Sequence, residues 1–205
     1  MLGLPRATEI NKPLPKKSLF EKFKPNAADR KLFDDQINRL SIVAEISPET
    51  VSVAASAEVS TIYVIAVTMK TADCDKKNIA LLSNLIDQRM LFVLQYGDHA
   101  RLAVYRAKKV FISEEKPTDD WQLNLSGLDL SVVWEHIIAQ IASIDLAGGK
   151  DIDATIAEND RREKLANQIA ALEKKARAET QPRRKWDYAE EIKRLKIELG
   201  GNTNE

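Results

Sequence analysis

Side chains that could act as catalysts or metal ligands are few in this chain, and they are not grouped in sequence. The two histidines, His99 and His136, form no H-x-x-x-H pattern, and Cys74 is the single cysteine. A structural metal site needs several such ligands at short spacing, and a disulfide needs two cysteines. Cys74 precedes a predicted helix, whose dipole would lower the thiol pKa. Because no histidine stands beside it, we interpret Cys74 as a small packing residue and both histidines as surface residues.

Carboxylates that follow a strand are the remaining candidates for chemistry. Asp73 and Asp75 come after a long apolar stretch, where metal-dependent nucleases gather carboxylates around Mg²⁺. Such enzymes commonly add Glu-x-Lys from another strand, whereas Glu45 is followed by Ile46 and Ser47. The glycines form no Walker A loop, no G-x-G-x-x-G turn and no G-x-S-x-G elbow. The sequence therefore predicts no catalytic residue, no metal site and no cofactor, and it leaves a divergent metal-dependent nuclease as an alternative.

The segment TQPRRKWDY, residues 180–188, has the composition of a binding surface. Arginine next to tryptophan suits phosphate contact with base stacking, or an aromatic–arginine hot spot for a protein partner. In the other interpretation, Trp186 packs across two helices and the basic side chains beside it are solvated. The candidate residues for binding a protein partner or nucleic acid are Arg183, Arg184, Lys185, Trp186 and Tyr188.

Two runs of apolar residues near the C-terminus predict the helices that carry this segment. In each run the gaps are four, three and four residues, as in a coiled-coil seam, but the second run is two residues out of step with the first. Pro182 lies between them, and proline is tolerated in the first turn of a helix rather than in its interior. We therefore expect a coiled-coil-like helical hairpin. The runs are Leu165, Ile169, Leu172, Ala176 and Tyr188, Ile192, Leu195, Leu199.

The preceding part of the chain predicts an α/β fold with a mixed sheet and flanking helices. Residues 60–70 and 90–96 are apolar, as expected of strands that are covered on both faces. A helical stripe lies between them, with Asp73 or Asp75 as its N-cap, so these segments predict a βαβ unit with parallel strands. The stripe is Ile79, Leu82, Leu85 and Ile86. Further strands are expected at 41–47, at 100–112 as one long or two short strands, and at 121–125 as an edge strand.

Helices and an N-terminal arm complete this predicted domain. Residues 1–27 contain four prolines, which predict an extended arm with one helical turn at 18–23. A helix is expected from Ala27 and another after Gly127, because apolar residues recur there at helical spacing. The stripe of the first helix is Leu32, Phe33, Ile37 and Leu40, and that of the second is Val133, Ile137, Ile141 and Ile144.

Composition bounds the organisation and the environment of the chain. We expect a mixed α/β domain over residues 1–149 and a helical hairpin over residues 150–205, divided at Gly148-Gly149. Lys+Arg and Asp+Glu number 31 each, which argues against coating of nucleic acid by bulk charge. Residues 1–40 nevertheless carry nine basic and five acidic residues. No stretch has the length of a signal peptide or membrane span, so we expect a cytoplasmic protein without a membrane partner.

Five segments, in their order along the chain, resemble a bacterial family known as domain of unknown function 4391. They are LGLPRATEINKPLPKKSLFEKF, INRLSIVAEISPETVSVA, MLFVLQYGDHARLAVYRAK, VWEHIIAQI and ETQPRRKWDYAEEIKRLK. The resemblance implies a small cytoplasmic protein without an assigned enzymatic activity. It also implies a gene beside DNA methyltransferase and helicase genes of restriction-like or phage-defence loci, and hence an accessory subunit. It assigns a role to no residue.

These observations favour a non-catalytic accessory or interaction protein that docks through its C-terminal helical hairpin. Its setting would be a DNA-modification or phage-defence system, in which it serves as a subunit or partner. The expected partner is another protein, or a second copy of the chain, held by the C-terminal helices. Direct nucleic-acid binding is the first alternative and the divergent nuclease is the second.

Overall fold

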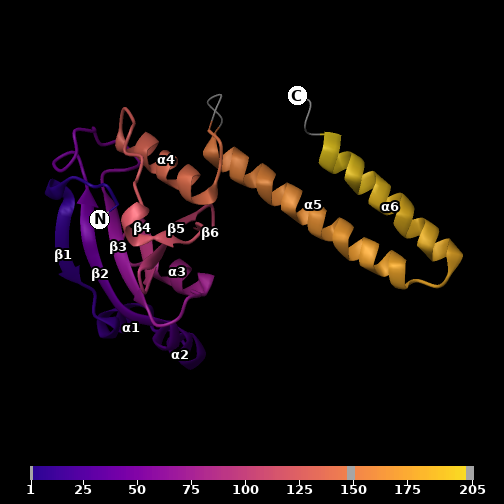
Figure 1. The fold of residues 1–205 in the computed structure, drawn as a ribbon, viewed down its shortest axis with the longest axis horizontal. Coiled ribbons are helices and arrows are strands. Elements are labelled where there is room, and N and C mark those ends of the chain that lie inside the picture. Colours follow the sequence, from indigo (N-terminus) through magenta and orange to yellow (C-terminus); the bar gives the residue numbers. More distant parts are fainter. Residues whose placement is uncertain (1, 147–150, 202–205) are drawn as a thin grey trace. The chain divides into compact units, whose positions relative to one another are not determined.

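A computed structural model describes residues 2–146 and 151–201 of the chain. The structure divides into two compact units, residues 1–148 and 149–205. The fold class is the predicted one: a mixed α/β unit is followed by two C-terminal helices in close contact (Figure 1). The boundary expected at Gly148-Gly149 lies outside the described residues. Within the described ranges, no helix combines the length and the apolar character that crossing a bilayer requires.

A mixed sheet forms the centre of the first unit. Its order is β1-β2-β3-β4-β5-β6, with the short β7 paired to β5. Among the strands of the described residues, β3 and β4 pair in parallel, as predicted for the βαβ unit, and the other strand pairs are antiparallel. The strands are β1 (Glu9–Pro13), β2 (Ile37–Ile46), β3 (Ile62–Met69), β4 (Arg89–Tyr96), β5 (His99–Arg106), β6 (Lys109–Ile112) and β7 (Lys116–Pro117). The helices are α1 (Lys16–Phe23), α2 (Ala27–Gln36), α3 (Lys76–Leu82) and α4 (Leu130–Ala142), with 3-10 turns at Arg6–Thr8 and Thr118–Asp120.

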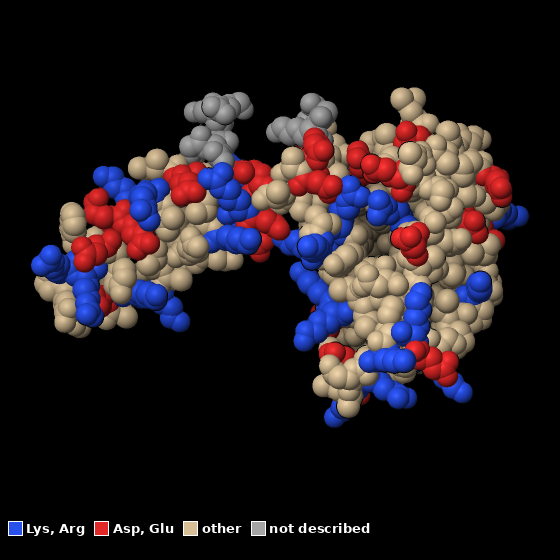
Figure 2. Space-filling model, turned by 180° about the vertical axis from the view of Figure 1, so that it is seen from behind, with Lys and Arg blue, Asp and Glu red and all other residues tan. Residues whose placement is uncertain are grey.

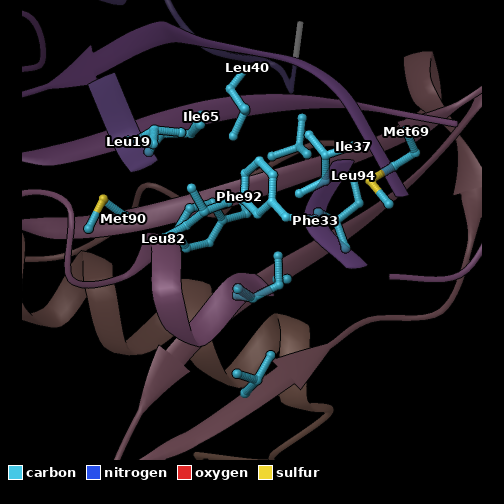
Figure 3. Packing of buried hydrophobic residues seen from close by; sticks show 14 residues of the cluster. Leu19, Phe33, Ile37, Leu40, Ile65, Met69, Leu82, Met90, Phe92 and Leu94 are labelled. Atoms are coloured by element: carbon cyan, nitrogen blue, oxygen red, sulfur yellow. The ribbon is translucent and has the colours of Figure 1, made fainter. Parts of the chain in front are cut away.

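Both faces of the sheet are buried, because successive residues of the central strands point to opposite sides. Phe92, together with Phe33 of α2 and Leu82 of α3, belongs to a cluster of buried residues that α1, α2 and α3 form against the sheet (Figure 3). Leu91 and Val93, the neighbours of Phe92 on β4, are buried as well, although they lie outside this cluster. The helix α4 contacts β5 and β6, and its buried residues also lie outside the cluster, as expected of a helix on the opposite face.

The N-terminal segment is part of the sheet rather than an extended arm. β1 pairs antiparallel with β2 and forms one edge of the sheet. The expected helical turn at 18–23 is an eight-residue helix, α1, whose Leu19 is 2% exposed. Proline has no amide hydrogen to donate to a neighbouring strand, so it is tolerated at the edge of a sheet and outside it. Pro13 accordingly ends the edge strand, and Pro15 precedes α1 as its N-cap.

Two helices are shorter than their apolar stripes suggested. α2 ends at Gln36, so Ile37 and Leu40 belong to strand β2 and not to the helix face on which they were expected. Both side chains are buried. The spacing of three residues between them fits a helix face, but it also fits a strand with a register shift, such as the one between Ile37 and Arg39. α3 likewise ends at Leu82, and Leu85 packs against the core from beyond the helix.

The segment expected as one long or two short strands at 100–112 forms the β5–β6 hairpin. Its turn residues, Ala107 and Lys108, have φ values of 50° and 62°, in the left-handed region typical of a two-residue hairpin turn. The edge strand expected at 121–125 is wrong. Trp121 is buried there and its indole Nε1 donates to the Ala100 carbonyl at 3.0 Å, while the earlier residues Lys116–Pro117 pair with β5. The buried Trp121 and hydrogen bonds to Leu2 and Gln140, and not a ladder, therefore attach this segment.

The second unit consists of α5 (Ile152–Ala178) and α6 (Pro182–Gly201). Asp151 caps α5 by accepting the Ala154 amide at 2.9 Å. α6 begins at Pro182, where the missing amide donor costs no helical hydrogen bond. The two helices contact one another along their length, which confirms the predicted hairpin and its bend at the proline.

Candidate interaction surface

Exposed ion pairs connect α5 and α6. The Arg161 guanidinium donates to the Glu198 carboxylate at 2.9 Å, and the Lys196 ammonium donates to Glu173 at 2.8 Å. The hydrogen bond and charge of Lys196 hold the pKa of Glu173 below its ordinary value. These contacts join the last turns of α6 to the middle of α5, as an antiparallel arrangement requires.

The apolar seams lie between the two helices, where one residue of each is buried and the others are half-buried. Leu195 is 7% exposed and Ile169 is 7% exposed, and each is the most buried residue of its predicted run. Among the described side chains of α6, those of the second run are buried or half-buried and all others are exposed. The run is Tyr188, Ile192, Leu195 and Leu199. Each run therefore serves to close the hairpin.

The connection between the helices is held by a carboxylate. Glu179 accepts the amides of Thr180 at 2.9 Å and Gln181 at 3.0 Å. These hydrogen bonds, that of Gln181 most of all, lower the pKa of Glu179, and the nearby charge of Arg184 acts in the same direction. The Lys185 amide then donates to the Gln181 carbonyl at 3.0 Å and opens α6. The first turn of α6 is thus fixed by backbone hydrogen bonds.

This first turn exposes the predicted binding residues. Arg183, Arg184, Lys185 and Trp186 are all exposed, and Trp186 retains 64% of its accessible surface. The interpretation in which Trp186 packs across the hairpin is therefore wrong, because the seam begins at Tyr188 instead. Within the described ranges, none of the three basic side chains takes part in an ion pair.

The predicted residues do not share one face of α6. Successive residues of a helix turn by about 100°, so Arg183, Arg184, Lys185 and Trp186 point around the whole circumference. Tyr188 lies on the side that faces α5. Trp186 points to the opposite side, which we call the outer face of α6.

Sequence reasoning missed a residue of this outer face. Ile197 is 66% exposed and follows Trp186 after close to three turns of helix, so the two lie in line. The signal was present in the sequence as an apolar pair eleven residues apart, outside the two seams. On the face of the molecule in view, positive and negative side chains alternate over the helical unit, without a field of one sign (Figure 2).

The carboxylates considered for a nuclease have other contacts. Asp75 caps α3 by accepting the Lys77 amide at 2.8 Å, and Asp73 pairs with Arg101 at 3.4 Å. Arg101 also pairs with Glu115 at 3.1 Å. Across residues 2–146 and 151–201, no three His, Cys, Asp or Glu side chains are placed to hold a metal ion together.

Cys74 and the histidines also have local roles. Burial, with a smaller contribution from the Asp75 charge, raises the pKa of Cys74 to about 12, opposite to the lowering expected before a helix. Its thiol donates to the Asp75 carbonyl at 3.7 Å. His99 is exposed, and His136 Nδ1 lies 2.7 Å from the Ser126 carbonyl oxygen.

An open pocket of about 340 Å³ lies beside α1, α2 and α3. Its apolar lining includes Phe20, Phe33 and Leu81, and its polar lining includes Asn78, which donates to Gln36 at 2.9 Å. Lys77 adds a cation that pairs with no described residue. The pocket offers an apolar lining and no nucleophile beside a general base.

Comparison with known proteins identifies the family but no characterised relative. No curated protein and no solved structure matches this chain. A family model matches residues 2–199, which include both the sheet and the hairpin. The chain therefore belongs to the family described as Domain of unknown function (DUF4391).

Proposed function

We propose that this chain is a non-catalytic interaction protein that docks onto a protein partner through its C-terminal hairpin. The observation that carries the proposal is Trp186, which is 64% exposed at the start of α6 beside Arg183 and Arg184. Tryptophan and arginine are enriched among the residues that dominate binding energy at protein interfaces. An exposed tryptophan also costs free energy in water, which a partner recovers by covering it.

The start of α6 is suited to binding because it is ordered before a partner arrives. Glu179 fixes the connection through two amides, and the ion pair between Arg161 and Glu198 anchors the other end of α6 to α5. A surface that is already held in one conformation loses less entropy when it binds. The neutral charge balance of the tail favours a protein over nucleic acid as the partner.

The setting of this interaction follows from the family resemblance. We propose that the chain is an accessory subunit of a DNA-modification or phage-defence system, in which a methyltransferase or helicase encoded nearby supplies the docking surface. An accessory role fits a hairpin whose two apolar seams are used internally and which exposes an aromatic ring and three cations in the first turn of α6.

Affinity purification of the full chain, produced together with the products of its neighbouring genes, tests this proposal. We expect one of those products to be recovered with the wild type, and its recovery to fall at least tenfold with Arg183→Ala/Arg184→Ala. Lys76→Ala/Lys77→Ala is the matched control, because these two adjacent cations are exposed on α3, which belongs to the other compact unit. Equal recovery with both double variants would show that the start of α6 is not the docking site.

Nucleic-acid binding is the second candidate, favoured by the exposed Arg183 and Arg184 and by the excess of basic residues in 1–40. Its signature is an affinity for DNA that falls steeply with salt and is lost in Arg183→Ala/Arg184→Ala. That result, with no protein partner recovered, would replace the proposed function. Mg²⁺-dependent DNA cleavage that Asp73→Ala abolishes would instead support the nuclease.

A further inference from the structure

The outer face of α6 carries two apolar side chains that the hairpin leaves uncovered. Trp186 is 64% exposed and Ile197 is 66% exposed. They are separated by about 16 Å along the helix axis, at a rise of about 1.5 Å per residue, and lie on the same side. The seam residues that pack against α5, such as Leu195, lie on the opposite side. Only a surface outside the hairpin can therefore bury these two residues.

The charges between the two apolar residues are ordered along the helix. Acidic residues occupy the half near Trp186 and basic residues occupy the half near Ile197. They are Asp187, Glu190 and Glu191, followed by Lys193, Arg194 and Lys196. Glu191 pairs with Arg194 at 3.9 Å, and Lys196 pairs with Glu173 of α5 at 2.8 Å.

Glu190 and Lys193 remain available to a partner. Both are exposed on the outer face, and neither forms an ion pair with a residue in the described part of the chain. They lie between Trp186 and Ile197, one on each side of the midpoint of that pair. The outer face therefore offers an apolar residue, an acid, a base and a second apolar residue, in that order.

A second copy of the same helix, running in the opposite direction, is complementary to this order. When Trp186 of one chain lies opposite Ile197 of the other, Glu190 lies opposite Lys193, because both pairs share one midpoint. A twofold axis repeats each contact, as in an isologous dimer. A parallel pairing would instead place Glu190 against its own copy. Acidic residues before basic residues also interact favourably with the helix dipole, so the charge order alone does not indicate a partner. What points to a second copy is that the charged pair and the apolar pair share one midpoint.

We infer that the outer face of α6 is a self-association surface, on which a second copy of this chain packs antiparallel with Trp186 opposite Ile197 and Glu190 opposite Lys193. The inference rests on the proposed function, since it names what covers Trp186 on the same hairpin and leaves Arg183 and Arg184 to the other protein. The two hairpins together form an antiparallel four-helix arrangement, in which the outer faces of the two α6 helices become its centre.

Analytical ultracentrifugation of the full chain across the micromolar range tests the inference by charge exchange. We expect a dimer for the wild type, and a dissociation constant roughly tenfold higher for Glu190→Lys or Lys193→Glu, because each places two like-charged pairs at the interface. An equimolar mixture of these two variants restores the dimer, because every charge then faces its opposite. Lys174→Glu, on α5, is the control that leaves the dissociation constant unchanged.

The mixture separates this arrangement from a general loss of folding. Trp186→Ala is expected to abolish the dimer while the helical circular dichroism is kept, because the exposed indole has no role in the seam. A wild type that stays monomeric, or single variants that do not complement one another, would overturn the inference. Partner capture by a monomeric chain would leave the proposed function standing. If the chain dimerises but its capture of another protein does not depend on Arg183 and Arg184, the proposed function is wrong and the dimer stands.

Discussion

The Arg161 guanidinium and the Glu198 carboxylate lie 2.9 Å apart, although 37 residues separate them in the chain. The contact holds the C-terminal part of α6 against the N-terminal half of α5. In this arrangement the seam residues lie between the two helices, and Trp186 and Ile197 lie on the side of α6 that faces away from α5. The register of the hairpin thus determines which apolar residues are used internally and which are presented to other molecules.

Replacement of Leu195 by alanine should destabilise the hairpin. Leu195 is 7% exposed in the seam, and removal of a buried leucine side chain costs about 2 kcal/mol or more. Urea unfolding followed by helical circular dichroism, at a protein concentration low enough to keep the chain monomeric, measures the change. Ile197→Ala on the same helix is the control and should have little effect, because Ile197 is 66% exposed. Equal losses for both variants would contradict the observed register.

The ion pair between Lys196 and Glu173 should make the stability of the hairpin depend on pH. The pKa of Glu173 is lowered from its ordinary value of 4.5, chiefly by the hydrogen bond from Lys196. A lowered pKa stabilises the folded state above 4.5, and this stabilisation is lost as pH falls through the folded-state value. The urea midpoint of the wild type should therefore exceed that of Glu173→Gln at neutral pH. The two midpoints should converge in acid, and a difference that stays constant there would exclude this origin.

Cys74 should react slowly with alkylating reagents. Burial raises its pKa from 9.0 to about 12, so at pH 8 the reactive thiolate is roughly a thousandfold scarcer than for an ordinary thiol. The rate of iodoacetamide labelling, followed by mass spectrometry, should rise by about that factor when the chain is unfolded in urea. Fast labelling of the folded chain would instead indicate a thiol that the helix dipole activates.

Asp75 should stabilise α3 as its N-cap. Its carboxylate accepts the Lys77 amide at 2.8 Å, and loss of such a cap costs about 1 kcal/mol. Asp75→Ala should therefore lower the free energy of unfolding, whereas Asp75→Asn keeps an acceptor oxygen and should not. Asp73→Ala is expected to change stability by less than about 0.5 kcal/mol, because Asp73 forms only an exposed ion pair with Arg101. A larger loss for Asp73→Ala than for Asp75→Ala would reverse the assignment.

Local patterns predicted the elements whose signal is contained within a few turns or strands. The hairpin follows from two seams that are out of step on either side of Pro182, since a proline inside one continuous helix is costly. The parallel pairing of β3 and β4 follows from an apolar strand, a helix and another apolar strand, because a crossover of that length brings the strands together in parallel.

Other features depended on contacts between distant segments. Residues 121–125 form no edge strand, because their backbone is hydrogen-bonded to Leu2 and the Gln140 side chain and the Trp121 indole is hydrogen-bonded to Ala100, contacts that periodicity does not reveal. The expected arm becomes strand β1 because β2 presents an edge with which it can pair. The raised pKa of Cys74 comes from burial that the folded core imposes, and not from the adjoining helix.

The sequence by itself determined the α/β class, the doubling back of the C-terminal helices and the exposure of the basic residues after Pro182, because these depend on local periodicity and on the geometry of proline. Only the tertiary structure decided which side of α6 faces outward. Packing against α5 buries the side of Tyr188 and Leu195, and Trp186 and Ile197 therefore remain exposed on the other side.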